Sequence, residues 1–139
     1  MSTFLLEIVT PERKVFAEQV DMVVVKGVEG DLGIMAGHIP LVTPLRISPV
    51  KIKMNGKDTW LAVHGGFIEV GQQKVVILAE SAELPEDIDV DRAKAAMVRA
   101  EQRLKMNERS KKDHVDFRRA EVSLQRALTR IEVTKHTKR

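Results

Sequence analysis

The sequence predicts a β + α protein, with a β-sandwich or flattened barrel over residues 1–84 and an antiparallel two-helix hairpin over residues 85–139. Three observations support this division. Short aliphatic runs separated by turn residues fill the first part. At Glu83–Asp87 a proline and acidic residues follow, which suit the start of a helix. Beyond that point, apolar residues recur with the spacing of two helical seams.

The predicted strands are rich in β-branched and aliphatic residues. Asn55-Gly56 is the strongest hairpin signal, because both residues tolerate the positive φ angles of a two-residue turn. So many short strands in about 80 residues favour a sandwich or flattened barrel. We expect strands at Phe4–Val9, Val15–Val20, Met22–Val25, Val50–Met54, Thr59–Val63, Phe67–Val70 and Lys74–Leu78.

Two helices are predicted from apolar series spaced 3, 4, 3, 4. One series is Val90, Ala93, Met97, Ala100 and Leu104, and the other is Phe117, Ala120, Leu124, Ala127 and Ile131. The polar segment Asn107–Asp113 between them is predicted to be the hairpin loop. Alanine-rich seams bury little apolar area, so the hairpin needs a docking surface, either permanently or as an element that moves between surfaces.

Composition excludes several classes of protein. The 139-residue chain has no apolar run near the roughly 20 residues of a membrane-spanning helix, so we expect no direct membrane insertion. Its amino terminus has no basic region of the kind that begins a signal peptide. The absence of cysteine excludes disulfides, thiolate metal ligands and a cysteine nucleophile.

Charge is divided unevenly between the two parts. Residues 1–84 carry eight Lys and Arg against ten Asp and Glu, whereas residues 85–139 carry fifteen against ten. Heptad positions bring Asp89 and Arg92 close to Arg126 and Arg130, with Arg99 further along. Clustered guanidinium groups suit bidentate capture of phosphate. The pattern predicts an anion site or an acidic partner, and a solvated basic face is the alternative.

Catalytic and metal-binding motifs are missing from the sequence. It contains no G-x-x-x-x-G-K-[ST], no H-E-x-x-H and no G-x-S-x-G. The four histidines are too scattered to suggest a metal site. We therefore expect a chain without its own active site.

Three segments carry a family resemblance. Glu29–Ile34 (EGDLGI), continuing through Gly37–Leu41 (GHIPL), closely resembles the signature of the epsilon subunit of bacterial F-type ATP synthase. Gly65–Val70 and Ile88–Ala93 resemble that subunit's other recurrent segments. The resemblance covers nearly the whole chain, in order.

The resemblance implies a non-catalytic central-stalk subunit, peripheral at the cytoplasmic face of the bacterial cell membrane. Its sandwich, of about ten strands, would bind the gamma subunit and the membrane rotor ring. Its hairpin would lie folded against the sandwich or extend among the alpha and beta subunits of the catalytic head, where it would inhibit ATP hydrolysis. By position, a loop facing the ring would contain Glu29, Gly30, Asp31, Leu32 and Gly33, and His38 would face gamma. An ordinary glycine-bearing turn and a structural histidine are the alternatives.

The resemblance also implies a regulatory nucleotide, with no other cofactor required and the need for Mg2+ left open. In several bacterial relatives the folded hairpin binds ATP, and the matching positions here are Glu83, Asp89, Arg92, Arg99, Arg126 and Arg130. The arginines would meet phosphates, and Glu83 would contact the base. Asp89 would orient an arginine or accept a hydrogen bond from the nucleotide, with a helix-surface pair to Arg92 as the alternative.

A nucleic-acid-binding module is the alternative function, because the hairpin is basic. However, aromatic residues make up only 4% of the chain, and its one tryptophan, Trp60, lies in the β part. The helices therefore have almost no groups on which bases can stack. The sequence favours the coupling subunit, with no nucleic acid among its partners.

Overall fold

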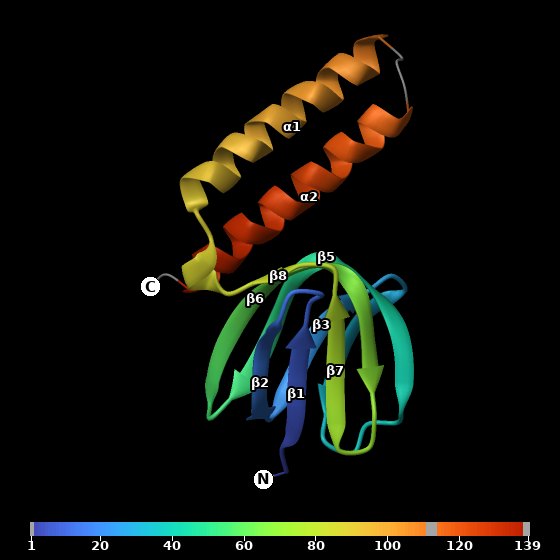
Figure 1. The fold of residues 1–139 in the computed structure, drawn as a ribbon, viewed down its shortest axis with the longest axis vertical. Coiled ribbons are helices and arrows are strands. Elements are labelled where there is room, and N and C mark those ends of the chain that lie inside the picture. Colours follow the sequence, from blue (N-terminus) through green and yellow to red (C-terminus); the bar gives the residue numbers. More distant parts are fainter. Residues whose placement is uncertain (1, 111–113, 138–139) are drawn as a thin grey trace.

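The structure is a computed structural model that describes residues 2–110 and 114–137, and their side chains except at 107–110 and 114–115. Figure 1 shows the strands gathered in one part and an antiparallel pair of helices, α1 and α2, lying across one end of it. The strands are β1 (Phe4–Val9), β2 (Lys14–Val20), β3 (Met22–Gly27), β4 (Gly30–Met35), β5 (Leu41–Met54), β6 (Lys57–Val70), β7 (Lys74–Ala79) and β8 (Ala82–Glu83). A 3-10 turn, η1 (Pro85–Asp87), leads to α1 (Val90–Ser110) and α2 (His114–Thr137).

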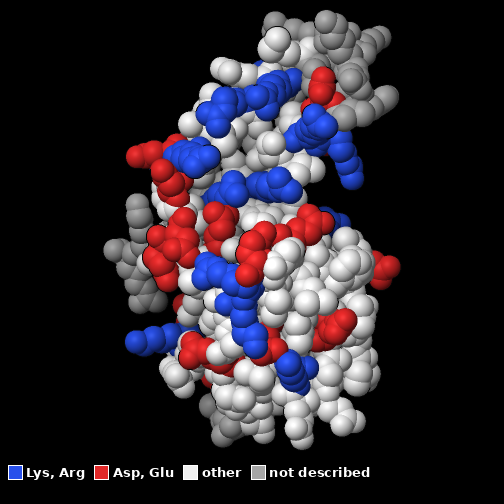
Figure 2. Space-filling view, viewed as in Figure 1, with Lys and Arg blue, Asp and Glu red and all other residues white. Residues whose placement is uncertain are grey.

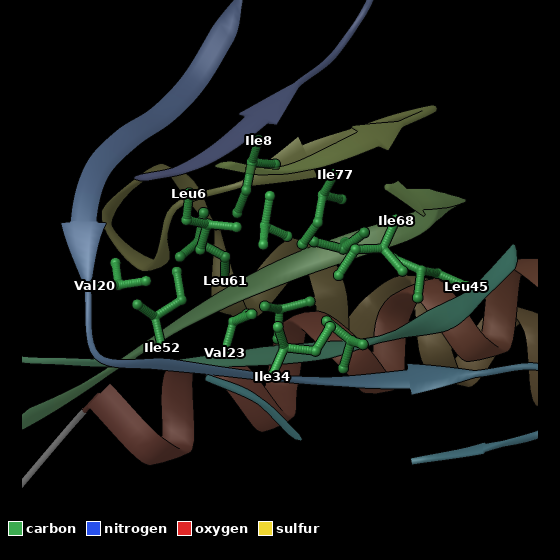
Figure 3. Packing of buried hydrophobic residues seen from close by; sticks show 14 of the residues in the cluster. Leu6, Ile8, Val20, Val23, Ile34, Leu45, Ile52, Leu61, Ile68 and Ile77 are labelled. Carbon is green, nitrogen blue, oxygen red and sulfur yellow. The ribbon is translucent and has the colours of Figure 1, made fainter. Parts of the chain in front are cut away.

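The strands pair in the order β2-β1-β7-β6-β5-β3-β4, and β8 pairs with β6. All described pairs are antiparallel except β1 with β7. Aliphatic side chains from these strands meet inside the curved sheet (Figure 3), and Leu6, Ile34, Ile52, Leu61 and Ile77 are fully buried there. Burial of this apolar surface is the main force that holds the sandwich together.

The predicted sandwich is confirmed, with eight strands where the resemblance implied about ten. The difference lies in β5 and β6, which are 14 residues long and whose pairing is interrupted between Leu45 and Ile47. If each is counted as two segments, the total is ten. On β6 the interruption coincides with Gly65 and Gly66, which have φ angles of 80° and 129°. A side chain at Gly66 would collide with the Leu78 carbonyl, so the close approach of β7 requires glycine there.

Two predicted loops are partly wrong. Gly30–Gly33 lies in β4, and of the predicted ring-facing loop only Glu29 lies in the turn before it. The glycines and Asp31 have low strand propensity, but antiparallel pairing with β3 holds them extended. In the hairpin, α1 continues through Asn107–Ser110, since helix propensity in polar residues does not require an apolar period. The rest of that predicted loop, 111–113, lies outside the described residues.

The seam between α1 and α2 is largely as predicted. Ala93, Ala100, Ala120, Ala127 and Ile131 are buried, whereas Phe117 is 37% exposed. A second buried face of α2 was not predicted: α2 packs on β5 and β6, and Thr129 and Val133 are buried away from the seam. This face explains why α2, the helix nearer the strands in Figure 1, anchors the hairpin while α1 packs chiefly on α2. Over the described residues, neither helix combines the length and the apolar character needed to cross a membrane.

Candidate functional site

A cleft of about 410 Å³ lies where β8, η1 and both helices meet. Side chains of both charges gather at this junction, and basic side chains continue along the hairpin (Figure 2). The lining consists of Glu83, Asp87, Asp89, Arg92, Ala93, Ala96, Arg99 and Arg130. Three carboxylates and three guanidinium groups therefore share one concave surface with two small alanine side chains.

Five of the six predicted nucleotide-site residues line this cleft, and Arg126 does not. Arg126 lies one helical turn before Arg130 on α2, and its Nε is buried with no hydrogen-bond partner among the described residues. The heptad pattern thus correctly brought Asp89, Arg92 and Arg130 to one place, with Arg99 at the end of the same lining.

Arg92, Ala96 and Arg99 share one face of α1 because they are spaced four and three residues apart. Arg92 and Arg99 are exposed, and neither makes an ion pair with another described residue. Ala96, between them, leaves space above the helix. This face presents two guanidinium groups to whatever anion enters the cleft.

Asp89 is the amino-terminal cap of α1. Its Oδ1 accepts a hydrogen bond of 3.0 Å from the Arg92 backbone N–H, and its carbonyl accepts the first helical hydrogen bond, from Ala93. The predicted alternative, a side-chain pair between Asp89 and Arg92, is absent from the described ion pairs. The bond to the backbone satisfies an otherwise unpaired amide and places the carboxylate at the positive end of the helix.

Glu83 joins the two parts of the molecule. Its Oε1 accepts hydrogen bonds from His64 Nε2 on β6 at 2.7 Å and from Arg130 Nε on α2 at 2.6 Å. Burial alone would raise the pKa of Glu83, but the hydrogen bonds from His64 and Arg130 and their charges outweigh it and hold that pKa below its usual value. The carboxylate is therefore ionised at neutral pH and binds the hairpin to the sandwich.

A second contact closes the other side of the junction. The rings of Trp60 on β6 and His136 on α2 are stacked, with centroids 3.9 Å apart and planes 8° apart. Lys51 Nζ lies 5.7 Å from the centroid of the Trp60 ring, and Glu132 Oε2 lies 3.6 Å from His136 Nε2. The last turns of α2 are thus held by an aromatic contact as well as by the Glu83 ion pair.

The other predicted interface residues lie apart from this cleft. Glu29, Gly30, Asp31 and Leu32 help to line a separate shallow cleft of about 410 Å³ beside β5, and Gly33 lies next to them on β4. His38 follows β4, and its Nδ1 lies 2.8 Å from the Ile39 carbonyl oxygen. Within the described part of the chain, no group of His, Asp and Glu is arranged to hold a metal ion.

Sequence reasoning did not place His64, Asp87 or His136 at this site. The signal for His64 is its place in β6: Leu61 and Val63 point into the core, so Ala62 and His64 point to the opposite side, yet both are buried. A polar residue buried on an outer face indicates a covering element and a hydrogen-bond partner. His136 carried no comparable signal.

Comparisons with known proteins agree with this architecture. The family model described as the ATP synthase delta/epsilon chain β-sandwich domain matches residues 3–85, and the model described as the delta/epsilon chain long α-helix domain matches residues 86–135. The class of protein is therefore that of the ATP synthase delta and epsilon chains.

Individual relatives refine this class. The ATP synthase epsilon chain of Halalkalibacterium halodurans is 51% identical over 133 residues, which is 96% of this chain and 98% of that one. The epsilon chain of Shouchella clausii is 49% identical over 98% of both chains. The chain belongs to the ATP synthase epsilon-chain family, as predicted, and is a non-catalytic subunit of that complex.

A solved structure shows the same fold at a larger evolutionary distance. A chain in the mitochondrial ATP synthase of Euglena gracilis, determined with its F1 part and c-ring, superposes with a TM-score of 0.79. The match covers 99% of this chain and 82% of that one, at 21% identity. The arrangement of sandwich and hairpin is therefore a known one.

Proposed function

We propose that the cleft between β8 and the hairpin binds ATP as a regulatory ligand while the hairpin is folded onto the sandwich. The observation that carries this proposal is that Glu83, Asp89, Arg92, Arg99 and Arg130, which sequence pattern and resemblance selected, surround one cleft. Its volume of about 410 Å³ lies in the range of small-molecule sites. Nucleotide binding would also offset the repulsion between neighbouring guanidinium groups.

Each lining group has a chemical role in this proposal. Arg92 and Arg99 donate to phosphate oxygens, which guanidinium groups bind in a bidentate manner. Arg130 keeps its Nε bond to Glu83 and offers its remaining N–H groups to the ligand. Asp89 contributes only through Oδ2, because Oδ1 caps α1. Glu83 accepts a hydrogen bond from the base or the ribose.

The test is calorimetric titration of the full chain with ATP and with ADP, each with and without Mg2+. Arg92→Ala should weaken ATP binding about tenfold or more, the effect of losing a charge-assisted hydrogen bond. Arg103→Ala is the matched control, because Arg103 is exposed on the same helix outside the cleft. Arg126→Ala tests the one predicted residue outside the lining. If the unmodified chain binds no ATP, the arginines serve only as a docking surface.

The wider role that we propose is that of a central-stalk subunit, peripheral at the cytoplasmic face of the bacterial membrane. In it the sandwich joins the gamma subunit to the rotor ring. Exposed apolar side chains support a protein interface on the sandwich: Ile39 is 79% exposed and Val42 67%, and Phe67 on β6 pairs with Leu78 on β7. The turn at Glu29 and the start of β4 would face the ring.

The proposed regulatory action is inhibition of ATP hydrolysis by the undocked hairpin, whose basic helices would contact acidic segments of the alpha and beta subunits. ATP favours the docked state only by its difference in affinity for the two states. Deleting residues 86–139 should raise ATP hydrolysis by the assembled complex and leave assembly intact. Unchanged hydrolysis would exclude the inhibitory role.

A further inference from the structure

His64 lies behind the candidate nucleotide site and is held through its backbone and its ring Nε2. Its side chain is 1% exposed, and its backbone N–H donates to the Ser81 carbonyl just before β8 at 2.9 Å. Its ring Nε2 lies 2.7 Å from Glu83 Oε1. Backbone and side chain thus both connect β6 to the short strand that carries Glu83, and turning the ring would break its bond to Glu83.

The hydrogen bond to Glu83 assigns the proton on the His64 ring. A carboxylate only accepts hydrogen bonds, so Nε2 carries the hydrogen and donates it. The other ring nitrogen, Nδ1, is buried and has no hydrogen-bond partner among the described residues. Within the described part of the chain, Nε2 is therefore the ring nitrogen that has a partner, and it acts as a fixed donor to Glu83.

Glu83 uses one oxygen for both of its bonds. His64 and Arg130 both donate to Oε1, whereas Oε2 makes no hydrogen bond with another described residue. Since Glu83 lines the cleft, one oxygen is committed to holding the junction, and the second is available to a ligand. A freely rotating carboxylate would have no such division, so the division depends on its two donors, of which His64 is the one that belongs to the sandwich.

We propose that His64 is a positioning residue of the nucleotide site, whose Nε2–H fixes the Glu83 carboxylate so that Oε2 accepts a hydrogen bond from the bound ligand. The ligand group is an N–H or O–H donor, such as the base amine or a ribose hydroxyl. This inference rests on the proposed ATP site and adds to it a residue from the outer face of β6, buried beneath the hairpin. It makes nucleotide affinity depend on a side chain that does not line the cleft.

The electrostatics of Glu83 give the proposal a second readout. The groups around Glu83 are His64 from β6, Asp87 from η1, Asp89, Arg92 and Arg99 from the start and face of α1, and Arg130 from α2. The His64 bond is one of the interactions that lower the pKa of Glu83. Loss of that bond raises this pKa, so the carboxylate is protonated, and becomes a weaker acceptor, at a higher pH.

The experiment compares His64→Gln with His64→Met in the full chain by calorimetric titration with ATP. Gln and Met have nearly the same length and flexibility, but only Gln keeps an N–H donor near the position of Nε2. His64→Met should weaken ATP binding about tenfold, and His64→Gln should stay within about threefold of the unmodified chain. As the pH is lowered below 6, ATP affinity should fall earlier in His64→Met than in His64→Gln.

A double-mutant cycle with Glu83→Gln separates positioning from packing. If His64 acts through Glu83, His64→Met has little further effect on ATP affinity once Glu83 is replaced. Equal losses in the Gln and Met variants, or an undiminished loss in the Glu83→Gln background, would overturn the proposal in favour of a packing role. If the unmodified chain binds ATP and both His64 variants bind it with that same affinity, the role of His64 is overturned and the proposed ATP site stands. No binding by the unmodified chain would overturn both.

Discussion

The sandwich and the hairpin are held by different kinds of contact. The sandwich encloses a continuous cluster of buried aliphatic side chains, to which nearly every strand contributes. The hairpin has alanines along much of its buried seam and meets the sandwich through a few specific groups: the Glu83–Arg130 ion pair, the Trp60–His136 stack and the buried face of α2. Apolar burial scales with area, so the two parts differ widely in intrinsic stability.

This difference suits an element that changes position. A ligand can shift an equilibrium only by its difference in affinity for the two states, which for a small molecule is a few kcal/mol. A hairpin docked by a large apolar interface would not respond to so small a bias. One held by an ion pair, a stacked ring and a short buried face can respond while the sandwich stays folded.

The largest expected effect comes from the sandwich core. Leu61→Ala removes a fully buried side chain and leaves a cavity, so it should lower the free energy of unfolding by about 2–5 kcal/mol. Urea denaturation measures this value. Leu128→Ala, at a position on α2 that is 41% exposed, is the matched control and should cost well under half as much. Equal losses would contradict the assignment of the core to the sandwich.

The next effect should be confined to the hairpin. Ala127→Leu adds bulk at a fully buried seam position and should destabilise the packing of α1 on α2 by about 1–3 kcal/mol. Amide hydrogen exchange should show faster exchange in both helices and unchanged protection in β1, β6 and β7. Ala95→Leu, at an exposed position of α1, is the control. A parallel loss of protection in the strands would show that the two parts unfold as one unit.

The same contrast explains which parts of the fold the sequence predicted. β1 was predicted to the residue and the helical seams nearly so, because periodic apolar side chains report burial on one face. β4 and the first half of β5 were missed because Asp31, Pro44 and Pro49 have low strand propensity. Pro49 is tolerated because residues 46–50 of β5 have no partner in β3, so no amide is needed there.

The candidate site could be predicted only in part, because the sequence does not show how the hairpin docks on the sandwich. The heptad pattern could place arginines on one flank of the hairpin, because that depends only on spacing within helices. It could not show that α2 turns a second face to β5 and β6, and so it predicted neither the Glu83–Arg130 pair nor the burial of His64. Those contacts depend on the docking of one domain on another, which no local period encodes.

A smaller effect is expected at the aromatic end of the junction. His136→Ala removes the ring stacked on Trp60 and should weaken docking of the hairpin by about 0.5–1.5 kcal/mol. Trp60 is the single tryptophan of the chain, so acrylamide quenching of its emission reports exposure at this contact. Quenching should increase in His136→Ala and stay unchanged in Lys135→Ala, whose side chain is exposed on the same turn. Unchanged quenching in both variants would show that the stack does not cover Trp60 in solution.

The smallest effect should come from the most exposed contact across the junction. Arg13 Nη2 lies 3.7 Å from Asp87 Oδ2, and the two side chains are 60% and 50% exposed, so solvent screens their attraction. Arg13→Ala should therefore change docking by no more than about 0.5 kcal/mol.

Arg130→Ala is the matched comparison, because it removes the same type of side chain from a half-buried pair and leaves Glu83 with one donor. Acrylamide quenching of Trp60 emission, at low and at high salt, measures docking of the hairpin in both variants. If Arg13→Ala undocks the hairpin as readily as Arg130→Ala, general charge attraction holds the hairpin, and the specific bonds at Glu83 do not.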